Sequence, residues 1–76
     1  MADEITDAAT VAATIGINAA LTVLRGLVDR GVIDLRSAQL MFDDVADRAL
    51  RASRHTPAVH AGVSRTVDDG VRLLSA

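Results

Sequence analysis

The only two histidines of the chain, His55 and His60, are spaced in a way that suggests chemistry. They flank a Thr-Pro pair. With Thr56 as the N-cap of a helix, they take the position before the cap and the fourth helical position. Two imidazoles that meet there resist double protonation and form a pH-sensitive pair. The same spacing also suits a simple packing contact between two rings. No third ligand lies at a suitable spacing, so we expect no metal site here.

Three aspartates close together offer carboxylate oxygens of the kind that hard cations bind: Asp43, Asp44 and Asp47. Two of them precede an arginine by four residues, namely Arg48 and Arg51, which is the spacing of ion pairs on a helix surface. A calcium loop also needs a glycine and alternating oxygen ligands, and this segment lacks both. We therefore interpret the aspartates as a solvated, ion-paired face, and we expect no metal and no cofactor.

Four arginines follow one another with no acid between them: Arg48, Arg51, Arg54 and Arg65. Such a cluster can bind nucleic acid or an acidic protein. Two observations weaken the nucleic-acid hypothesis. Positive side chains late in a helix are expected from the helix dipole alone, and Phe42, the only aromatic residue, leaves almost nothing to stack on bases. A nucleic-acid-binding regulator is therefore an alternative prediction.

Composition limits the function classes further. The chain has 76 residues, no cysteine and a formal net charge of −2. No cysteine nucleophile, glycine-rich phosphate loop or catalytic triad is evident, and a chain of this length has little room for a concave site. We therefore predict that the protein is not an enzyme. All eight basic residues are arginine, which we interpret as codon bias of a GC-rich, bacterial-like genome.

The localisation prediction depends on the N-terminal third. A signal peptide begins with positive charge, whereas this chain begins with Asp3 and Glu4. A helix needs about 20 apolar residues to span a bilayer, and the uncharged stretch from Ala8 to Leu24 is slightly shorter than that. It is also rich in threonine and alanine. We expect a cytoplasmic protein with no membrane association.

The elements that carry these residues are predicted to be three helices in one domain, over about residues 4–30, 35–54 and 57–75. Gly31 follows the first helix as a left-handed C-terminal cap, with Val32 folding back in a Schellman turn. Asp34 is the expected N-cap of the second helix. Thr56 and Pro57 are a typical helix start. The fold class is all-α, with an antiparallel hairpin of the first two helices and the third packing across them.

The first helix is long, is interrupted only by Gly16, where a kink is possible, and carries two apolar stripes on different sides. A row of threonines, continued by Asn18, runs beside them, and we expect it to be partly buried. A monomer of this size buries only about 60% of its unfolded surface. We therefore predict that a homo-oligomer, with a dimer favoured, completes the core through the first half of this helix. The predicted interface consists of Ile5, Ala8, Ala12, Ile15, Gly16, Asn18, Ala19 and Ala20.

The predicted function combines these observations. We expect a helical interaction module that associates with itself through the first helix and presents its charged outer faces to a partner protein.

Overall fold

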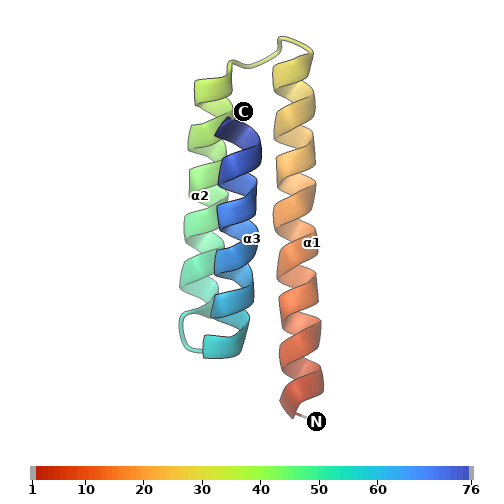
Figure 1. The fold of residues 1–76 in the computed structure, drawn as a ribbon, viewed down its shortest axis with the longest axis vertical. Coiled ribbons are helices and arrows are strands. Elements are labelled where there is room, and N and C mark those ends of the chain that lie inside the picture. The colour runs from red at the N-terminus through yellow and green to blue at the C-terminus, as the bar shows by residue number, and fades with distance from the viewer. Residues whose placement is uncertain (1, 76) are drawn as a thin grey trace.

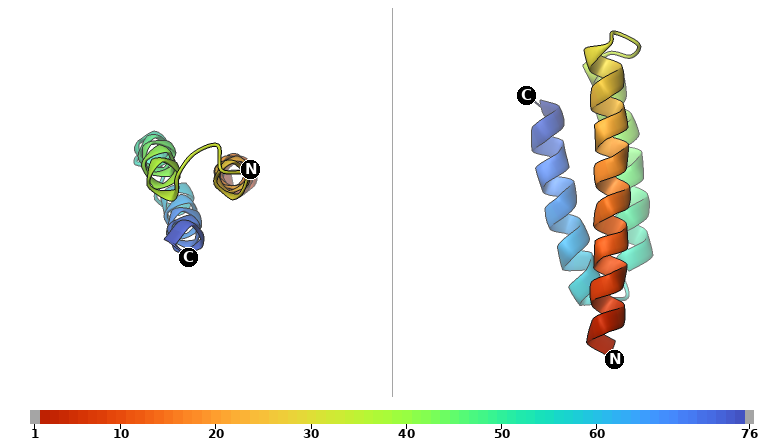
Figure 2. Two further views of the ribbon diagram at one scale, coloured as in Figure 1. Left: turned by 90° about the horizontal axis from the view of Figure 1, so that it is seen from above. Right: turned by 90° about the vertical axis from the view of Figure 1, so that its right-hand side faces the viewer.

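The protein is described here by a computed structural model, which covers the backbone of residues 2–75 and the side chains of residues 7–75. Three helices follow one another: α1 (Ala2–Asp29), α2 (Leu35–Ser53) and α3 (Pro57–Ser75). Consecutive helices run antiparallel and all three pack together (Figure 1). The result is an elongated bundle of 45 × 17 × 16 Å. The expected all-α class is confirmed, but α3 lies lengthwise beside α1 and α2 rather than steeply across them (Figure 2).

α1 is one uninterrupted helix that passes through Gly16. The kink that the sequence allows at that residue stays a prediction. Its N-terminal end extends beyond the turn that joins α2 to α3 (Figure 1). The second of its two stripes faces the core, because Ile17, Leu21 and Leu24 are buried. The first stripe, which includes Ala8, Ala12, Ile15 and Ala19, faces outward, because these residues are exposed. Within one chain, therefore, one stripe is packed in the core and the other is exposed to water.

The connection from α1 to α2 forms as the sequence predicts. Gly31 has a φ of 71°, the left-handed conformation that glycine adopts at low cost. The N–H of Val32 donates to the Leu27 carbonyl at 2.9 Å, and the N–H of Gly31 donates to the Val28 carbonyl at 3.0 Å, which together make a Schellman motif. The side chain of Val32 remains largely exposed.

The starts of α2 and α3 follow different rules. Asp34 caps α2, since its Oδ1 accepts a hydrogen bond from the N–H of Ser37 at 2.7 Å. Hydrogen bonds from the Ser37 side chain and backbone lower the pKa of Asp34 below its ordinary value. α3 begins at Pro57, and the carbonyl of Thr56 accepts the first helical hydrogen bond, from the N–H of His60 at 2.9 Å.

The core lies along the axis between the three helices. Phe42 of α2 is 1% exposed and packs against α3 at Gly70, where a Cβ atom would lie 2.8 Å from the ring Cε2. The other buried hydrophobic residues are Ile17, Leu21, Leu24, Ala38, Ala46, Val59, Val63, Val67 and Leu74. The side-chain amide of Gln39 ties α2 to the end of α3 by donating to the Leu74 carbonyl at 3.1 Å.

α1 and α3 approach each other closely through threonine and glycine. A Cβ atom added to Gly62 would lie 2.6 Å from Cγ2 of Thr10. One turn further, the hydroxyl oxygens of Thr14 and Thr66 are 3.5 Å apart. Thr66 donates its own proton to the Gly62 carbonyl at 3.0 Å, so Thr14 is the donor between the two hydroxyls. Thr10 and Thr14 are therefore half-buried inside the chain, whereas Asn18 and Thr22 of the same row are exposed.

Candidate functional site

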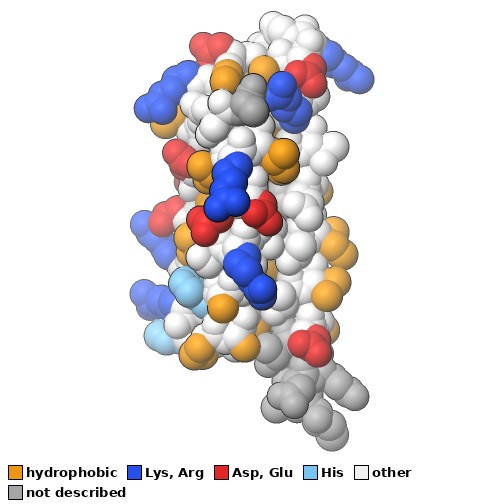
Figure 3. Space-filling view, viewed as in Figure 1, with side chains coloured by type: hydrophobic (Ala, Val, Ile, Leu, Met, Phe, Trp, Pro, Cys, Tyr) orange, Lys and Arg blue, Asp and Glu red, His pale blue; other side chains and the backbone are white. Residues whose placement is uncertain are grey.

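The outward side of α1 is an apolar, exposed helix face. Its residues recur at helical spacing, are all exposed and carry no charge; we call them the α1 outer face: Ala8, Val11, Ala12, Ile15, Ala19 and Val23. Ile15 is 64% exposed and Val23 is 61% exposed. In Figure 3 the charged side chains gather over α2 and α3, while the flank formed by α1 is mostly uncharged. An apolar face of this kind is typical of an interaction surface.

Two hollows continue this apolar surface into the groove between α1 and α2. The first has a volume of about 330 Å³ and is lined by Ala19, Ala20, Val23, Leu24, Met41 and Val45. The second has a volume of about 340 Å³ and is lined by Ala9, Ala13, Ala49, Ala52, Ser53, Thr56 and Val59. The α1–α2 groove is thus incompletely filled by the chain itself, and small alanine side chains make up almost half of the residues that line the two hollows.

Most of the predicted oligomer interface is accessible. Ala8, Ala12, Ile15, Gly16 and Ala19 are exposed. Asn18 is also exposed and Ala20 is half-buried, while the side chain of Ile5 lies outside the described residues.

Sequence reasoning missed three large residues of this surface. Val11 and Val23 of α1 are exposed, and Met41 of α2, which the sequence places on the core-facing stripe, is 48% exposed. The row of Ala12, Ile15 and Ala19 continues at helical spacing to Val23, which is a signal that the sequence does contain.

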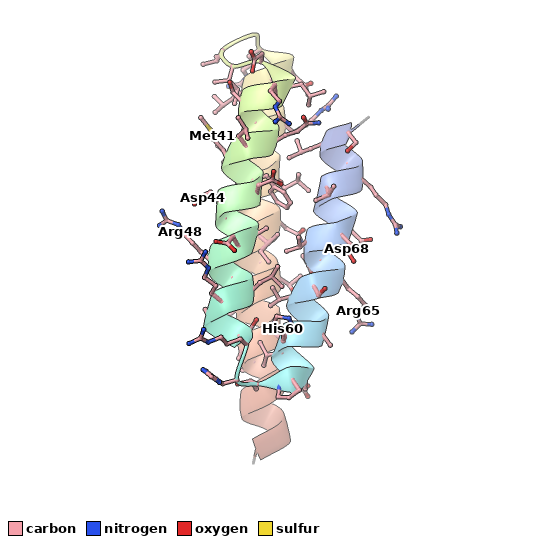
Figure 4. All side chains as sticks on the ribbon, turned by 90° about the vertical axis from the view of Figure 1, so that its left-hand side faces the viewer. Met41, Asp44, Arg48, His60, Arg65 and Asp68 are labelled. Carbon is pink, nitrogen blue, oxygen red and sulfur yellow. The ribbon has the colours of Figure 1, made fainter. Side chains whose placement is uncertain are left out.

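The predicted arginine patch is not gathered in one place. Arg48 points to the outer edge of α2, and Arg65 points to the opposite edge, on α3 (Figure 4). Arg48 pairs with Asp44 at 3.2 Å, and Arg51 pairs with Asp47 at 3.0 Å, as their spacing predicts. Both pairs are exposed, so each contributes at most a few tenths of a kcal/mol. Within residues 7–75 Arg65 makes no ion pair within 4.0 Å, although Asp69 follows it at the four-residue spacing of helical ion pairs.

The two histidines interact with different neighbours. His60 lies between α2 and α3 (Figure 4), with its Nδ1 3.2 Å from the buried hydroxyl of Ser53. That hydroxyl also donates to the carbonyls of Ala49 and Leu50, at 3.0 and 3.2 Å. Its proton is therefore directed to the backbone and not to the imidazole, which is a structural arrangement and not that of an activated nucleophile.

His55 is exposed and accepts a hydrogen bond at its Nε2 from Nε of Arg54, at 3.1 Å. No hydrogen bond joins the two imidazoles in the part of the chain with described side chains. In that same part, no group of three histidine, aspartate or glutamate side chains is placed to hold a metal ion.

A further hollow, of about 610 Å³, lies between the C-terminal half of α1 and the end of α3. It is lined by Leu21, Thr22, Arg25, Gly26, Asp29 and Leu73. The only charged groups in its lining are Arg25 and Asp29, which form an ion pair with each other at 3.3 Å. No pair of titratable groups is left there for acid–base chemistry.

One segment, Asp7–Asp29 of α1, is long and apolar enough by length and composition to cross a membrane. Only 11% of its most apolar stretch is buried in the bundle. This observation is weak evidence for a membrane, but it shows how much apolar surface α1 leaves uncovered. The chain matches no protein-family model, no curated protein and no solved structure.

Proposed function

We propose that the protein is a non-enzymatic interaction module that associates with itself through the α1 outer face and presents the charged outer faces of α2 and α3 to a partner protein. The observation that carries this proposal is the position of Ile15 and Val23, large apolar side chains that α1 leaves in water. Burial of apolar surface is the main driving force of association. A second copy would supply that burial.

The total surface area supports the proposal. The chain exposes 5188 Å², whereas size scaling gives ~4,400 Å² for a compact monomer of this mass. The chain therefore has more surface for its mass than a compact monomer, in keeping with its elongated shape of 45 × 17 × 16 Å. A chain with this much uncovered surface gains more from association than a compact monomer does.

Sedimentation equilibrium on the purified chain, together with the variants Ile15→Glu and Leu40→Glu, tests the proposal. Both positions are more than half exposed, so neither substitution disturbs the core. We expect a dimer for the unmodified chain and for Leu40→Glu. Ile15→Glu buries an unpaired carboxylate at the interface, which costs a few kcal/mol and weakens the dimer about 100-fold.

Two results would contradict the proposal. One is a well-folded monomer of the unmodified chain at micromolar concentration, with folding checked by circular dichroism. The other is an oligomer that Ile15→Glu and Leu40→Glu weaken equally, since association would then not depend on α1.

A further inference from the structure

The charge distribution along α1 indicates how two copies pair. We infer that α1 of a second copy covers the α1 outer face in the antiparallel orientation, with the twofold axis between Ile15 and Gly16. This inference rests on the proposed self-association and adds the orientation, the register and the contribution of α2. The partner that we propose for this face is a second copy of the chain, and binding to a lipid surface is an alternative outcome of the test.

The ends of α1 carry opposite charge. Three acidic residues lie in its first two turns: Asp3, Glu4 and Asp7. Near the other end Arg25 pairs with Asp29 of its own chain, and Arg30, which directly follows α1, has no ion pair among the residues with described side chains. A parallel arrangement places the acidic ends of both copies side by side, where like charges repel. An antiparallel arrangement places each acidic end against the basic end of the other copy and also opposes the helix dipoles.

The sizes of the side chains favour the same orientation. With the axis between residues 15 and 16, residue i of one copy faces residue 31 − i of the other, so Val23 faces Ala8 and Ile15 faces Gly16. Large side chains then lie opposite small ones, as in well-packed helix interfaces. A parallel arrangement in the same register would place Ile15 on Ile15 and Val23 on Val23. It would leave Ala8 facing another alanine instead of Val23, whereas Ala12 faces an alanine in either arrangement.

α2 extends the surface on which the second copy lies. Met41 lines the same hollow as Ala19 and Val23, so it stands beside the C-terminal half of the α1 outer face. In the antiparallel register, that half faces the segment around Ala8 and Ala12 of the second copy. The flexible thioether side chain of Met41 is well suited to cover those alanines. The twofold symmetry repeats this contact, so both hollows of the pair are covered in the same way.

Single cysteines test the orientation directly, because the sequence contains no cysteine. The variants are Ala8→Cys, Ile15→Cys and Val23→Cys, all at exposed positions. Each is treated with a short thiol-specific crosslinker, alone and in a mixture of Ala8→Cys with Val23→Cys. In the antiparallel pair, the thiols of two Ala8→Cys chains lie about 22 Å apart along the helix axes. The thiol of an Ala8→Cys chain is instead adjacent to that of a Val23→Cys partner.

The expected result is efficient crosslinking of Ile15→Cys alone and of the Ala8→Cys and Val23→Cys mixture. Ala8→Cys and Val23→Cys should crosslink weakly when each is alone. Efficient crosslinking of Ala8→Cys with itself overturns the antiparallel orientation but leaves the proposed function intact. A dimer by mass that none of these cysteines crosslinks overturns the α1 contact. A monomeric mass overturns the proposed function itself.

Flotation with phosphatidylcholine vesicles distinguishes a lipid surface from a second copy. We expect the unmodified chain to stay with the soluble fraction. A monomer that floats with the vesicles, and that Ile15→Glu releases from them, would replace the second copy with a bilayer as the occupant.

The neighbouring residues Met41 and Leu40 provide a matched control for the contribution of α2. Both are about half exposed, at 48% and 53%, but only Met41 lines the hollow beside α1. We expect Met41→Ser to weaken the dimer about tenfold and Leu40→Ser to weaken it less than about twofold. Equal effects of the two substitutions would show that α2 takes no part in the contact.

Discussion

Two pairs of glycines distinguish the packed side of the molecule from its open side. Gly62 and Gly70 of α3 are buried, and a Cβ atom at either position would overlap Thr10 or Phe42. At Gly16 and Gly26 of α1, apart from the adjacent residues and the nearby backbone of α1 itself, no atom lies within 4 Å of the place that a Cβ atom would occupy. Glycine is therefore required in α3 because other helices approach it. In α1 nothing within the chain requires it.

This difference shows where the chain satisfies its own packing and where it does not. α3 is close to both neighbours, through the Phe42 ring on one side and the threonines of α1 on the other. Along its first half α1 approaches α3 closely, whereas the groove between this half and α2 is partly open and its outward side faces water. Interiors of folded proteins are close-packed, so the open glycines and hollows mark the side on which another surface can be added.

Gly70→Ala should cause the largest effect. The added methyl group overlaps the ring of Phe42, which is 1% exposed and packed in the core. We expect a loss of about 1–3 kcal/mol of unfolding free energy, measured by urea denaturation. In a double-mutant cycle, Phe42→Leu should cost less in the Gly70→Ala background than in the unmodified chain. Additive effects would mean that the two residues do not meet.

Gly62→Ala should have a smaller effect of the same sign. The added methyl group lies 2.6 Å from Cγ2 of Thr10, a side chain at the edge of the core that is only half-buried. We expect a loss of about 1 kcal/mol. Thr10→Ser removes the overlapping methyl group and should restore most of that loss in the double variant. An increase in stability from Gly62→Ala alone would contradict the close approach of α1 and α3.

Gly16→Ala and Gly26→Ala should have the opposite sign. Each adds a methyl group in open space and replaces a poor helix former, so each should stabilise the monomeric Ile15→Glu chain by about 0.5–1 kcal/mol. Thermal unfolding of the two variants in that background provides the measurement. In the otherwise unmodified chain, Gly16→Ala should weaken self-association more than Gly26→Ala, because Gly16 lies at the centre of the inferred contact. Destabilisation by either substitution would show that α1 is distorted or covered there.

The smallest expected effect concerns Asp34, which caps α2 at the end of the α1–α2 groove. Its folded-state pKa lies below the ordinary value of 3.8, because Ser37 hydrogen-bonds to the ionised form. The stability from this cap is therefore fully present above pH 3.8 and is lost as the pH falls through the lower folded-state pKa. Asp34→Asn retains a capping side chain that does not titrate. The unfolding free energies of the unmodified chain and of Asp34→Asn, measured as a function of pH, should change differently only below about pH 4. The same pH dependence in both proteins would contradict the cap.

The sequence predicted the helices well because their signals are local. Gly31, Asp34 and Pro57 each act within one turn of the helix end that they determine, so the observed ends fall within two residues of the predicted ones. The core-facing stripe of α1 was also readable, since Ile17, Leu21 and Leu24 recur at helical spacing.

The assignment of residues to packed or open sides could not be predicted in the same way. Met41 and Phe42 are adjacent apolar residues, yet only Phe42 is buried, because Gly70 of α3 leaves room for a ring. Val71 belongs to the apolar stripe of α3 by spacing but is 43% exposed, whereas Gly62 and Gly70 are buried. These outcomes depend on the approach of helices far apart in sequence, which periodicity does not report.

The 45 Å length of the bundle has a consequence for small-angle scattering. Two rods that join side by side in opposite directions have twice the mass of one, while their greatest dimension hardly grows. Rods that join end to end would double that dimension. The scattering profile of a dilution series would therefore separate lateral growth from filament-like growth without any label.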